Sequence, residues 1–559
     1  MFHKRVNQSS MFEPWYSLSP EKQRRLERSW ADLFRTKALP LIEEGLFAGM
    51  YSDTGRPNAP VQTLIGFLIL KEMGDLTYRE ALDQLEFNMQ WHHALQLTAD
   101  QAHFPQKTVH NFLERLQEQD GAKIAFQSIT HRIVEALGIK TVRQRVDSTH
   151  IMSNFAMLTL LGLFCETMRV FLKALGMEHP RLFDRVPEGP RRRYLKENGD
   201  STRYEDARSS DGPRRISVCG RDIYRLLGLF SGTAAAKMEQ YQLLQRLFSE
   251  QCVVAQEDSR PEDDDDDAGE GSVPVRLKEP KEISSDTLQT PHDPDVTYSG
   301  HKGKGYEVQV CETTHEDNAV EIITEVRVTK SCGSDANETM PTIESLKDCG
   351  LQPEELIADT TFGCAKNAVA AERLGTELVS PVAGNSGAEP EATEQGATPF
   401  TDVDFAIDLT CQSPAKCPAG HEAIRQDAHP QTDRKIRLTF SREACDNCPM
   451  FRLCCPKANV KDENYVVDVD LEAANRELRR RSESDGSFRK RYAARAGIEA
   501  TNSELKRAHG LGRLRVRGRR RVELFAYLKA TACNVKRMVN AIHARIAQNV
   551  DAETVSVGA

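Results

Sequence analysis

The stretch YAARAGIEATNSELK, Tyr492–Lys506, places a phenol, a guanidinium, a carboxylate and an ammonium at helical spacing. Arg495, Glu499 and Lys506 follow Tyr492 at offsets of three, seven and fourteen residues. At about 100° per residue, these offsets return to within about 60° of one helix face. Such a face is unusual for a protein core and suits a site that grips phosphates around a metal-binding acid. The sequence therefore predicts one helix with a functional face.

Two further acids stand at the ends of apolar, β-like runs. Asp147 follows TVRQRV, and Asp359 follows EELIA. Taken alone, an aspartate after a strand is more often a cap or a surface turn. Together with Glu499, however, the two aspartates match a two-metal site, where hard oxygen ligands hold divalent ions about 4 Å apart. We therefore predict that Asp147, Asp359 and Glu499 are catalytic and bind Mg²⁺ (or Mn²⁺).

The pattern around Asp359 is that of a mixed α/β fold. GYEVQVCET (Gly305–Thr313) and AVEIITEVRVT (Ala319–Thr329) flank a polar turn and predict a hairpin. The helix MPTIESLKDCG, the strand ELIAD, the helix AKNAVAAERLG and the strand ELVSPV follow. The strand that ends at Asp147 must pair with strands more than 150 residues later, so a helical domain inserted into the sheet is expected.

The chain is expected to divide into several parts, since 559 residues exceed one core. The expected order is an N-terminal helical domain (1–138), a first core strand (139–150), a helical insertion (151–256), an acidic disordered linker (257–290), an α/β core (291–383), a cysteine-rich insertion (384–470), a core helix with a basic segment (471–545) and a disordered tail (546–559). For the N-terminal domain, packing or dimerisation is as reasonable a role as DNA binding.

Charge is segregated along the chain, although its formal net charge is -9. The run Glu262–Asp267 is acidic, and Arg476–Arg521 is crowded with arginine, so the basic end can bind polyanions. Neither a secretory signal nor a membrane-spanning run is recognised, which favours a cytoplasmic protein. Fourteen cysteines then indicate thiols or a metal site rather than disulfides.

These motifs resemble those of the DDE transposases of bacterial insertion sequences, in the branch with a Tyr-x2-Arg-x3-Glu-x6-Lys signature. The signature is matched by Tyr492, Arg495, Glu499 and Lys506. Asp147-Ser148-Thr149 and the segment from Ala358 to Gly363 are similar to the family's two aspartate motifs. The tail Gly512–Met538 also resembles the family's usual ending, an Arg/Gly segment followed by a helix.

The resemblance implies a ribonuclease-H-like catalytic core that cleaves transposon ends and transfers the freed 3′-OH into target DNA. It implies double-stranded DNA as the partner, a homodimer that joins two ends, and location at the bacterial nucleoid. Arg495 and Lys506 would hold phosphates, and Tyr492 would contact the DNA backbone. Relatives can stack a flipped base on tryptophan near the site; here Trp15, Trp30 and Trp91 are N-terminal. Another aromatic, such as Tyr298, Tyr306 or Phe362, would have to serve.

Several alternatives remain open for the same residues. Arg495 and Glu499 can form an ordinary i,i+4 ion pair. Glu504 is a rival third acid, but it lies about 140° from Glu499 around the helix and is interpreted as a solvated residue. The chain can also be an inactive or domesticated relative, or a zinc-dependent DNA-binding regulator whose acids are caps.

A cysteine cluster precedes the signature helix. Cys445-Asp446-Asn447-Cys448 is a tight thiolate pair, which Cys417 and Cys454 can complete to a tetrahedral Zn²⁺ site. Cys411, His421 and Cys455 are substitute ligands, and some members of the resembled subgroup carry a cysteine-bearing insertion here. Reduced, partly buried thiols are the alternative.

A dense basic run follows the signature. Arg513, Arg515 and Arg517 belong to a group of six arginines within nine positions, more than surface solvation requires. Such a run is expected to bind DNA phosphates in a salt-dependent way.

Overall fold

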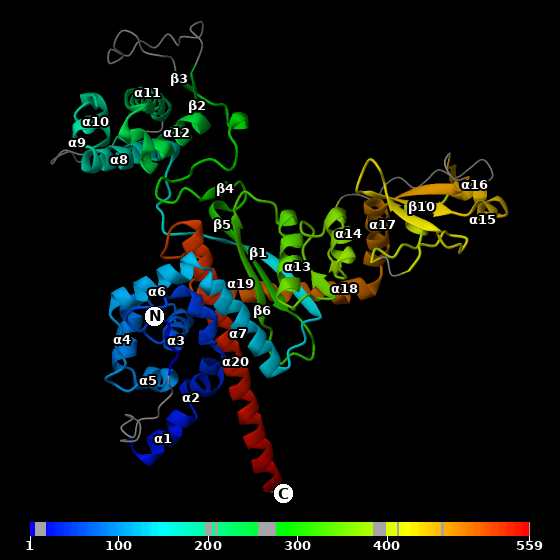
Figure 1. The fold of residues 1–559 in the computed structure, drawn as a ribbon, viewed down its shortest axis with the longest axis horizontal. Coiled ribbons are helices and arrows are strands. Elements are labelled where there is room, and N and C mark those ends of the chain that lie inside the picture. The colour runs from blue at the N-terminus through cyan, green and yellow to red at the C-terminus, as the bar shows by residue number, and fades with distance from the viewer. Residues whose placement is uncertain are drawn as a thin grey trace.

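The computed structural model describes residues 1–5, 18–195, 204–206, 211–254, 275–383, 399–410, 413–459 and 463–557. Figure 1 shows a central sheet flanked by an N-terminal helical part, with a helical insertion and a β-rich module projecting away from it. Trp15, Cys411 and the acidic run Glu262–Asp267 lie outside the described residues.

The central sheet has the spatial order β6-β5-β1-β7-β8, with the short β4 beside β5. Its strands are β1 (Arg143–Ile151), β4 (Thr297–Ser299), β5 (Gly303–Thr313), β6 (Ile323–Lys330), β7 (Glu355–Ile357) and β8 (Glu377–Val379). β5 is antiparallel to both β1 and β6, whereas β7 is parallel to β1 and β8 is parallel to β7. The predicted hairpin, the strand–helix–strand series and the long-range pairing of the first strand are confirmed.

The first strand is longer than predicted. It does not end at Asp147, because β5 pairs with β1 as far as Ile151↔Tyr306. Asp147 therefore lies in the middle of β1 and pairs with Val310. Ser148 and Thr149, which follow the acid, are also strand residues, because they pair with Gln309 and Val308 of β5.

Two hydrophobic cores cover the two faces of this sheet. On one face, α13 (Thr339–Asp348), which follows the short η8 (Asp335–Asn337), and α14 (Ala365–Arg373) pack on Val146, Cys311 and Leu356. On the other face, Ile151, Val308 and other strand residues join a large core that also contains the N-terminal helices and the last helix. The N-terminal part thus shares its core with the central sheet.

The N-terminal part is helical, as expected. Its elements are α1 (Pro20–Glu27), α2 (Trp30–Leu33), the π-helix η2 (Phe34–Ala38), η3 (Leu39–Leu41), η4 (Glu44–Met50), α3 (Val61–Met73), α4 (Tyr78–Phe87), α5 (Met89–Leu95), α6 (Gln106–Glu118) and α7 (Gly121–Leu137). α4 starts at a capping box in which the side chains of Thr77 and Glu80 cap each other's backbone. α3 is buried nearly all round and contacts the C-terminal helix α20 (Arg519–Val557).

The helical insertion has its own core, built on Phe171, Ile223 and Leu244 among others. It comprises α8 (Leu160–Glu178), α9 (Pro180–Phe183), α10 (Glu188–Tyr194), α11 (Gly212–Phe230), η5 (Ala234–Lys237), α12 (Glu239–Gln251), β2 (Cys252–Val254), β3 (Val275–Leu277) and η7 (Pro280–Glu282). The prediction of a disordered linker over 257–290 is wrong for its end, because β3 pairs with β2 and η7 follows it.

The β-rich module holds the cysteines and is called the cysteine module below (residues 399–410, 413–459 and 463–470). Its strands pair in the order β11-β12-β10-β9. The elements are η9 (Asp402–Asp404), β9 (Arg425–Ala428), β10 (Lys435–Phe440), α15 (Arg442–Asp446), α16 (Phe451–Cys454), β11 (Lys457–Ala458) and β12 (Tyr465–Asp470).

The chain returns from this module to the sheet through helices. They are α17 (Leu471–Glu483), α18 (Gly486–Ala493), the 3-10 turn η10 (Ala494–Ala496), α19 (Gly497–Arg507) and the long α20 (Arg519–Val557). The disordered tail expected from residue 546 is instead helical as far as Val557. No helix in the described part of the chain is long and apolar enough to cross a membrane.

Candidate active site

Asp147 on β1 and Asp359, two residues after the end of β7, lie at equivalent positions along neighbouring chain segments. The last parallel pair between β1 and β7 is Arg145↔Ile357, and each aspartate comes two residues after its member of that pair. Parallel strands lie about 4.8 Å apart, so the two carboxylates share one edge of the sheet. Burial raises the pKa of Asp147, and the nearby Asp359 carboxylate adds to the rise, while Arg495 and the Ser148 amide oppose it.

The loop after β7 fixes the second aspartate. One oxygen of Asp359, Oδ1, accepts hydrogen bonds from the backbone amides of Thr361 and Phe362 at 2.9 and 3.1 Å. The backbone carbonyl of Asp359 accepts a bond from the hydroxyl of Ser380, which follows β8. One carboxylate oxygen is thus held by the turn, and the loop itself is tied to the next strand.

Arg495 and Asn502 hold the first aspartate from the signature helices. Arg495 Nη2 donates to Asp147 Oδ1 at 3.0 Å, and Asn502 Nδ2 donates to Asp147 Oδ2 at 3.2 Å. Asn502 was not among the predicted site residues. A signal was present, because it follows Arg495 by seven residues and therefore lies within about 20° of it around a helix.

Glu499 is connected to Asp147 by Arg495, which contacts both carboxylates. Its Oε1 lies 3.8 Å from Arg495 Nη1, and its side chain is 71% exposed. The i,i+4 ion pair is therefore present, and the same guanidinium contacts both Asp147 and Glu499. Among the described residues, the three acids do not form a set whose ligand atoms all lie within 4.8 Å of one another. Their joint metal binding stays a prediction.

The signature is not one regular helix, contrary to expectation. A 3-10 turn, η10, separates α18 from α19. We attribute this 3-10 turn to Arg145, whose Nη1 donates a hydrogen bond to the carbonyl oxygen of Ala494 at 2.6 Å. Its guanidinium also lies against Gly497, where an added Cβ would come 2.1 Å from Arg145 Nη1. Arg145 from β1 thus tightens the helical segment that carries Arg495.

Gly497→Ala should destabilise the protein, although alanine normally stabilises a helix. The new Cβ would displace the Arg145 guanidinium, which is 11% exposed and paired with Glu312 at 2.7 Å. We expect the free energy of unfolding to fall by about 1–3 kcal/mol. Denaturant titration measures this, with Gly486→Ala as the control because nothing lies within 4 Å of its added Cβ. Equal stability of the two variants would contradict the prediction.

The remaining signature residues lie near the aspartates. Tyr492 stacks on Phe488 with ring centroids 5.6 Å apart, and burial raises its pKa. Burial lowers the pKa of Lys506, while the charges of Glu307 and Asp147 oppose that shift.

The three aromatic candidates for base stacking differ in exposure. Tyr306 and Phe362 are buried in the cores at 1% and 0% exposure, so neither can stack a flipped base. Tyr298, at 43%, is exposed.

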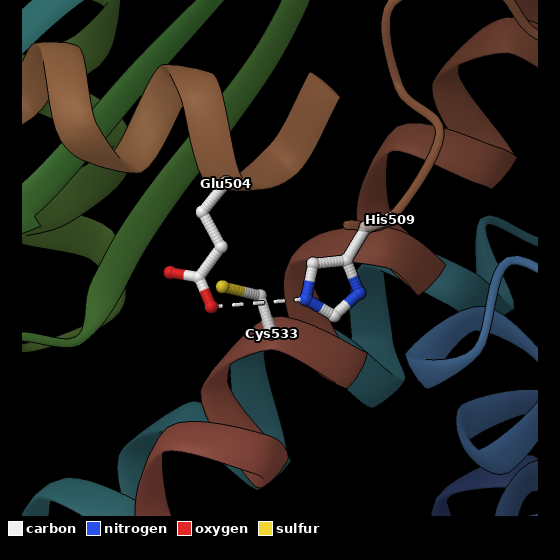
Figure 2. A group of neighbouring side chains, drawn as sticks. All are labelled: Glu504, His509 and Cys533. Carbon is white, nitrogen blue, oxygen red and sulfur yellow. Dashed lines mark ion pairs between the residues drawn. The ribbon is translucent and has the colours of Figure 1, made fainter. Parts of the chain in front are cut away.

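Glu504 is not the solvated residue that the sequence suggested. Its Oε2 accepts two bonds from Arg537, at 2.8 and 3.0 Å. Figure 2 shows its carboxylate turned toward Cys533 of α20 and His509, with a 4.0 Å ion-pair contact to His509 Nε2. Glu504 therefore packs between α19 and α20 instead of facing solvent.

Glu504, His509 and Cys533 have the chemistry of metal ligands, and their ligand atoms lie within 4.8 Å of one another. His509 Nδ1 lies 3.0 Å from the Glu72 carbonyl oxygen, which makes Nδ1 the protonated nitrogen. Burial lowers the pKa of His509, and the charges of Lys536 and Lys529 lower it further. Because these charges and Arg537 oppose a bound cation, we assign no metal to this group.

The predicted DNA-binding arginines lie on an extended segment beside the end of β1. The Met152 amide donates to the Gly512 carbonyl at 3.0 Å, and the Asn154 amide donates to the Val516 carbonyl at 2.9 Å. Leu514 is buried between the exposed Arg513, Arg515 and Arg517. Arg515 donates to the Asp75 carbonyl, and Arg517 donates to the Asn154 carbonyl. A row of arginines therefore faces solvent next to the strand that carries Asp147.

The predicted zinc ligands lie elsewhere. Cys417, Cys445, Cys448 and Cys454 line one small cavity in the cysteine module. This module projects from the side of the sheet beyond α14 and α17 (Figure 1), so its cysteines are separate from the acids.

Two family models match parts of the chain. Residues 416–539 match the family described as "Transposase DDE domain", and residues 21–115 match "Transposase domain (DUF772)". The first match includes the signature and most of the cysteine module, whereas Asp147 and Asp359 lie outside it. Neither a curated protein nor a solved structure matches the chain. The two matched domains support an insertion-sequence DNA transposase.

Proposed function

We propose that this protein is a DNA transposase that cleaves transposon ends in a metal-dependent reaction and transfers the 3′-OH into target DNA. One observation carries the proposal: Asp147 and Asp359 share one edge of the sheet, while Arg495 contacts both Asp147 and Glu499. These residues come from chain segments more than 130 residues apart and meet at one place.

The sheet supports a ribonuclease-H-like core. Three antiparallel strands are followed by two parallel ones, and the first aspartate lies on the central strand. Helical connections precede β7 and β8, which is how parallel strands are joined. We infer that the helical insertion and the cysteine module are additions to this core, because each leaves and re-enters it and has its own hydrophobic cluster.

The donor atoms fit a hard divalent cation. The two aspartates offer carboxylate oxygens, which Mg²⁺ prefers, and the desolvated Asp147 carboxylate needs a positive partner. Asp147 and Asp359 would hold the metal, and Glu499 would complete the set. When bound, the metal supplies activation of the attacking oxygen and stabilisation of the leaving oxygen.

Arg495 can pair either with Asp147, as in the described structure, or with a DNA phosphate. In the described structure its guanidinium neutralises Asp147, so a cation and this arginine compete for the same carboxylate. We infer that Arg495 turns to a DNA phosphate when metal and DNA bind, since guanidinium binds phosphate in a bidentate manner. Asn502 would keep Asp147 oriented meanwhile, because its amide carries no charge.

The arginine row marks the DNA path that we propose. In an extended segment alternate residues lie about 6.6 Å apart on one face, so Arg513, Arg515 and Arg517 can contact successive phosphates. Lys506 lies close enough to Asp147 for the aspartate charge to raise the lysine pKa. A homodimer is part of the proposal, because two transposon ends must be joined.

Arg513→Ala should weaken DNA binding and make it less dependent on salt. Losing one phosphate contact lowers the slope of log K against log salt by about 0.9. Fluorescence anisotropy with duplex DNA at several salt concentrations measures that slope. Arg373→Ala, an exposed arginine at the end of α14, is the control and should leave the slope unchanged. An unchanged slope for Arg513→Ala would remove this residue from the DNA path.

A cleavage assay tests the proposed function. The substrate is the DNA that flanks the gene, cloned in a plasmid so that both element ends are present. We expect Mg²⁺-dependent breaks at the element ends, released 3′-OH groups and insertion into a second plasmid. DNA that is bound but never cut, with Mg²⁺ or Mn²⁺, would overturn the proposal and favour the inactive relative or the regulator.

A further inference from the structure

The cysteine module has too little apolar core to explain its order. Six buried hydrophobic residues form the cluster: Phe405, Ala415, Ala423, Leu438, Phe440 and Val469. Domains with so small a core usually need a disulfide or a structural metal. The cysteines described there, Cys417, Cys445, Cys448, Cys454 and Cys455, are all free thiols, so disulfides do not supply the support.

Four of these thiols surround one cavity. Cys417, Cys445, Cys448 and Cys454 line it together with apolar groups such as Phe440 and Phe451. The cavity is about 20 Å³, room for little more than one water molecule. An ion has a suitable size for this space, and sulfur is one of the ligand atoms that Zn²⁺ prefers.

Local backbone structure presents the sulfurs in two turns. In the first, the Gly420 amide donates to the Cys417 carbonyl, and Gly420 has a φ of +85°, which favours glycine. In the second, α15 ends and the Cys448 amide donates to the Cys445 carbonyl at 3.1 Å. Cys454 follows at the end of α16. The first turn carries one thiol and the second a Cys-x2-Cys pair, and such a pair together with more distant ligands is typical of zinc sites.

We propose that Cys417, Cys445, Cys448 and Cys454 bind one structural Zn²⁺ ion. Zn–S bonds of about 2.3 Å place tetrahedral ligands about 3.8 Å apart. Among the described residues no three cysteine sulfurs lie within 4.8 Å of one another, so metal binding draws the two turns together. His421 also lines the cavity, whereas Cys455 is turned away and its thiol donates to the Arg452 carbonyl at 3.0 Å.

The zinc would also steady the second catalytic aspartate. β12 of the module leads directly into α17, whose Arg479 donates to the carbonyls of Gly363 and Ser380 at 2.7 and 2.6 Å. Gly363 and Ser380 both contact Asp359 through hydrogen bonds. Zinc binding in the cysteine module would therefore also stabilise α17, whose Arg479 holds the loop that carries Asp359.

Metal analysis of the purified full-length protein tests the proposal. We expect about one zinc per chain, and Cys448→Ser should bind less than about a tenth of that, because a three-sulfur site is much weaker. Cys455→Ser is the matched control and should keep its zinc. Co²⁺ exchanged into the protein should give the visible absorption of a tetrahedral thiolate site. A wild-type protein without zinc that also fails to bind added Zn²⁺ or Co²⁺ overturns the proposal.

A second measurement covers the case in which the serine variant misfolds. Chelator treatment of the wild-type protein should expose the module to limited proteolysis, and added Zn²⁺ should restore protection. Protection that is identical with and without chelator, in protein shown to have lost its metal, overturns the structural role of the ion. Asp147→Asn should keep its zinc, so failure of the catalytic proposal and failure of the zinc proposal give different results.

Discussion

Asp147→Asn is expected to lower the rate of DNA strand cleavage by about 10³-fold or more, equivalent to about 4 kcal/mol of transition-state stabilisation. Asparagine keeps the shape of the side chain and its hydrogen bond from Asn502, but it removes the charge that a cation requires. DNA affinity should change by less than about threefold, because phosphate contacts dominate it. The measurement compares single-turnover cleavage with anisotropy binding at the same salt concentration.

Two controls make the result specific. Asp348→Asn removes an exposed carboxylate from the end of α13 and should leave cleavage unchanged. Asp359→Asn should be as inactive as Asp147→Asn, and the double variant should be scarcely worse, because groups that act as one unit are not additive. Wild-type cleavage by either single variant would exclude that carboxylate from the reaction.

The positions of the two aspartates could be read from the sequence because strand periodicity is a local signal. EELIAD has an apolar run before the acid, TVRQRVD has valines at alternating strand positions, and parallel neighbours bring the two acids close together. The end of β1 could not be read in this way. Ser148 and Thr149 look like turn residues, but the partner strand β5, more than 150 residues later, keeps them extended.

The break in the signature helix depends on tertiary contacts that local sequence does not contain. Tyr492–Lys506 has helical spacing throughout, and nothing in it marks Ala494–Ala496 as a 3-10 turn. We attribute the turn to Arg145, which lies about 350 residues earlier in the chain and donates a hydrogen bond to the Ala494 carbonyl. Likewise, Glu504 was judged by its angle from Glu499, and its true environment is set by Arg537 of α20.

Buried charge at Glu312 explains how these distant elements are held together. Glu312 is fully buried on β5, directly opposite Arg145 of β1. Its two oxygens bind Arg145 at 2.7 Å and Arg537 of α20 at 3.0 Å, and Thr501 of α19 donates to it at 2.6 Å. One carboxylate thus connects the strand that carries Asp147 with both C-terminal helices.

Glu312→Gln should therefore lower the free energy of unfolding by about 3–5 kcal/mol, because it leaves buried guanidinium groups without their carboxylate. Arg145 would lose its charged partner, whereas Arg537 would keep Glu504. Denaturation can be followed by tryptophan fluorescence, since Trp91 is buried in the same core as α20. Glu316→Gln, in the exposed turn after β5, is the control and should unfold like the wild type. If Glu312→Gln unfolds at the same denaturant concentration as that control, the buried charges do not hold α19 against β1. The position of Arg495 beside Asp147 must then depend only on the contacts of Arg145 with Ala494 and Gly497.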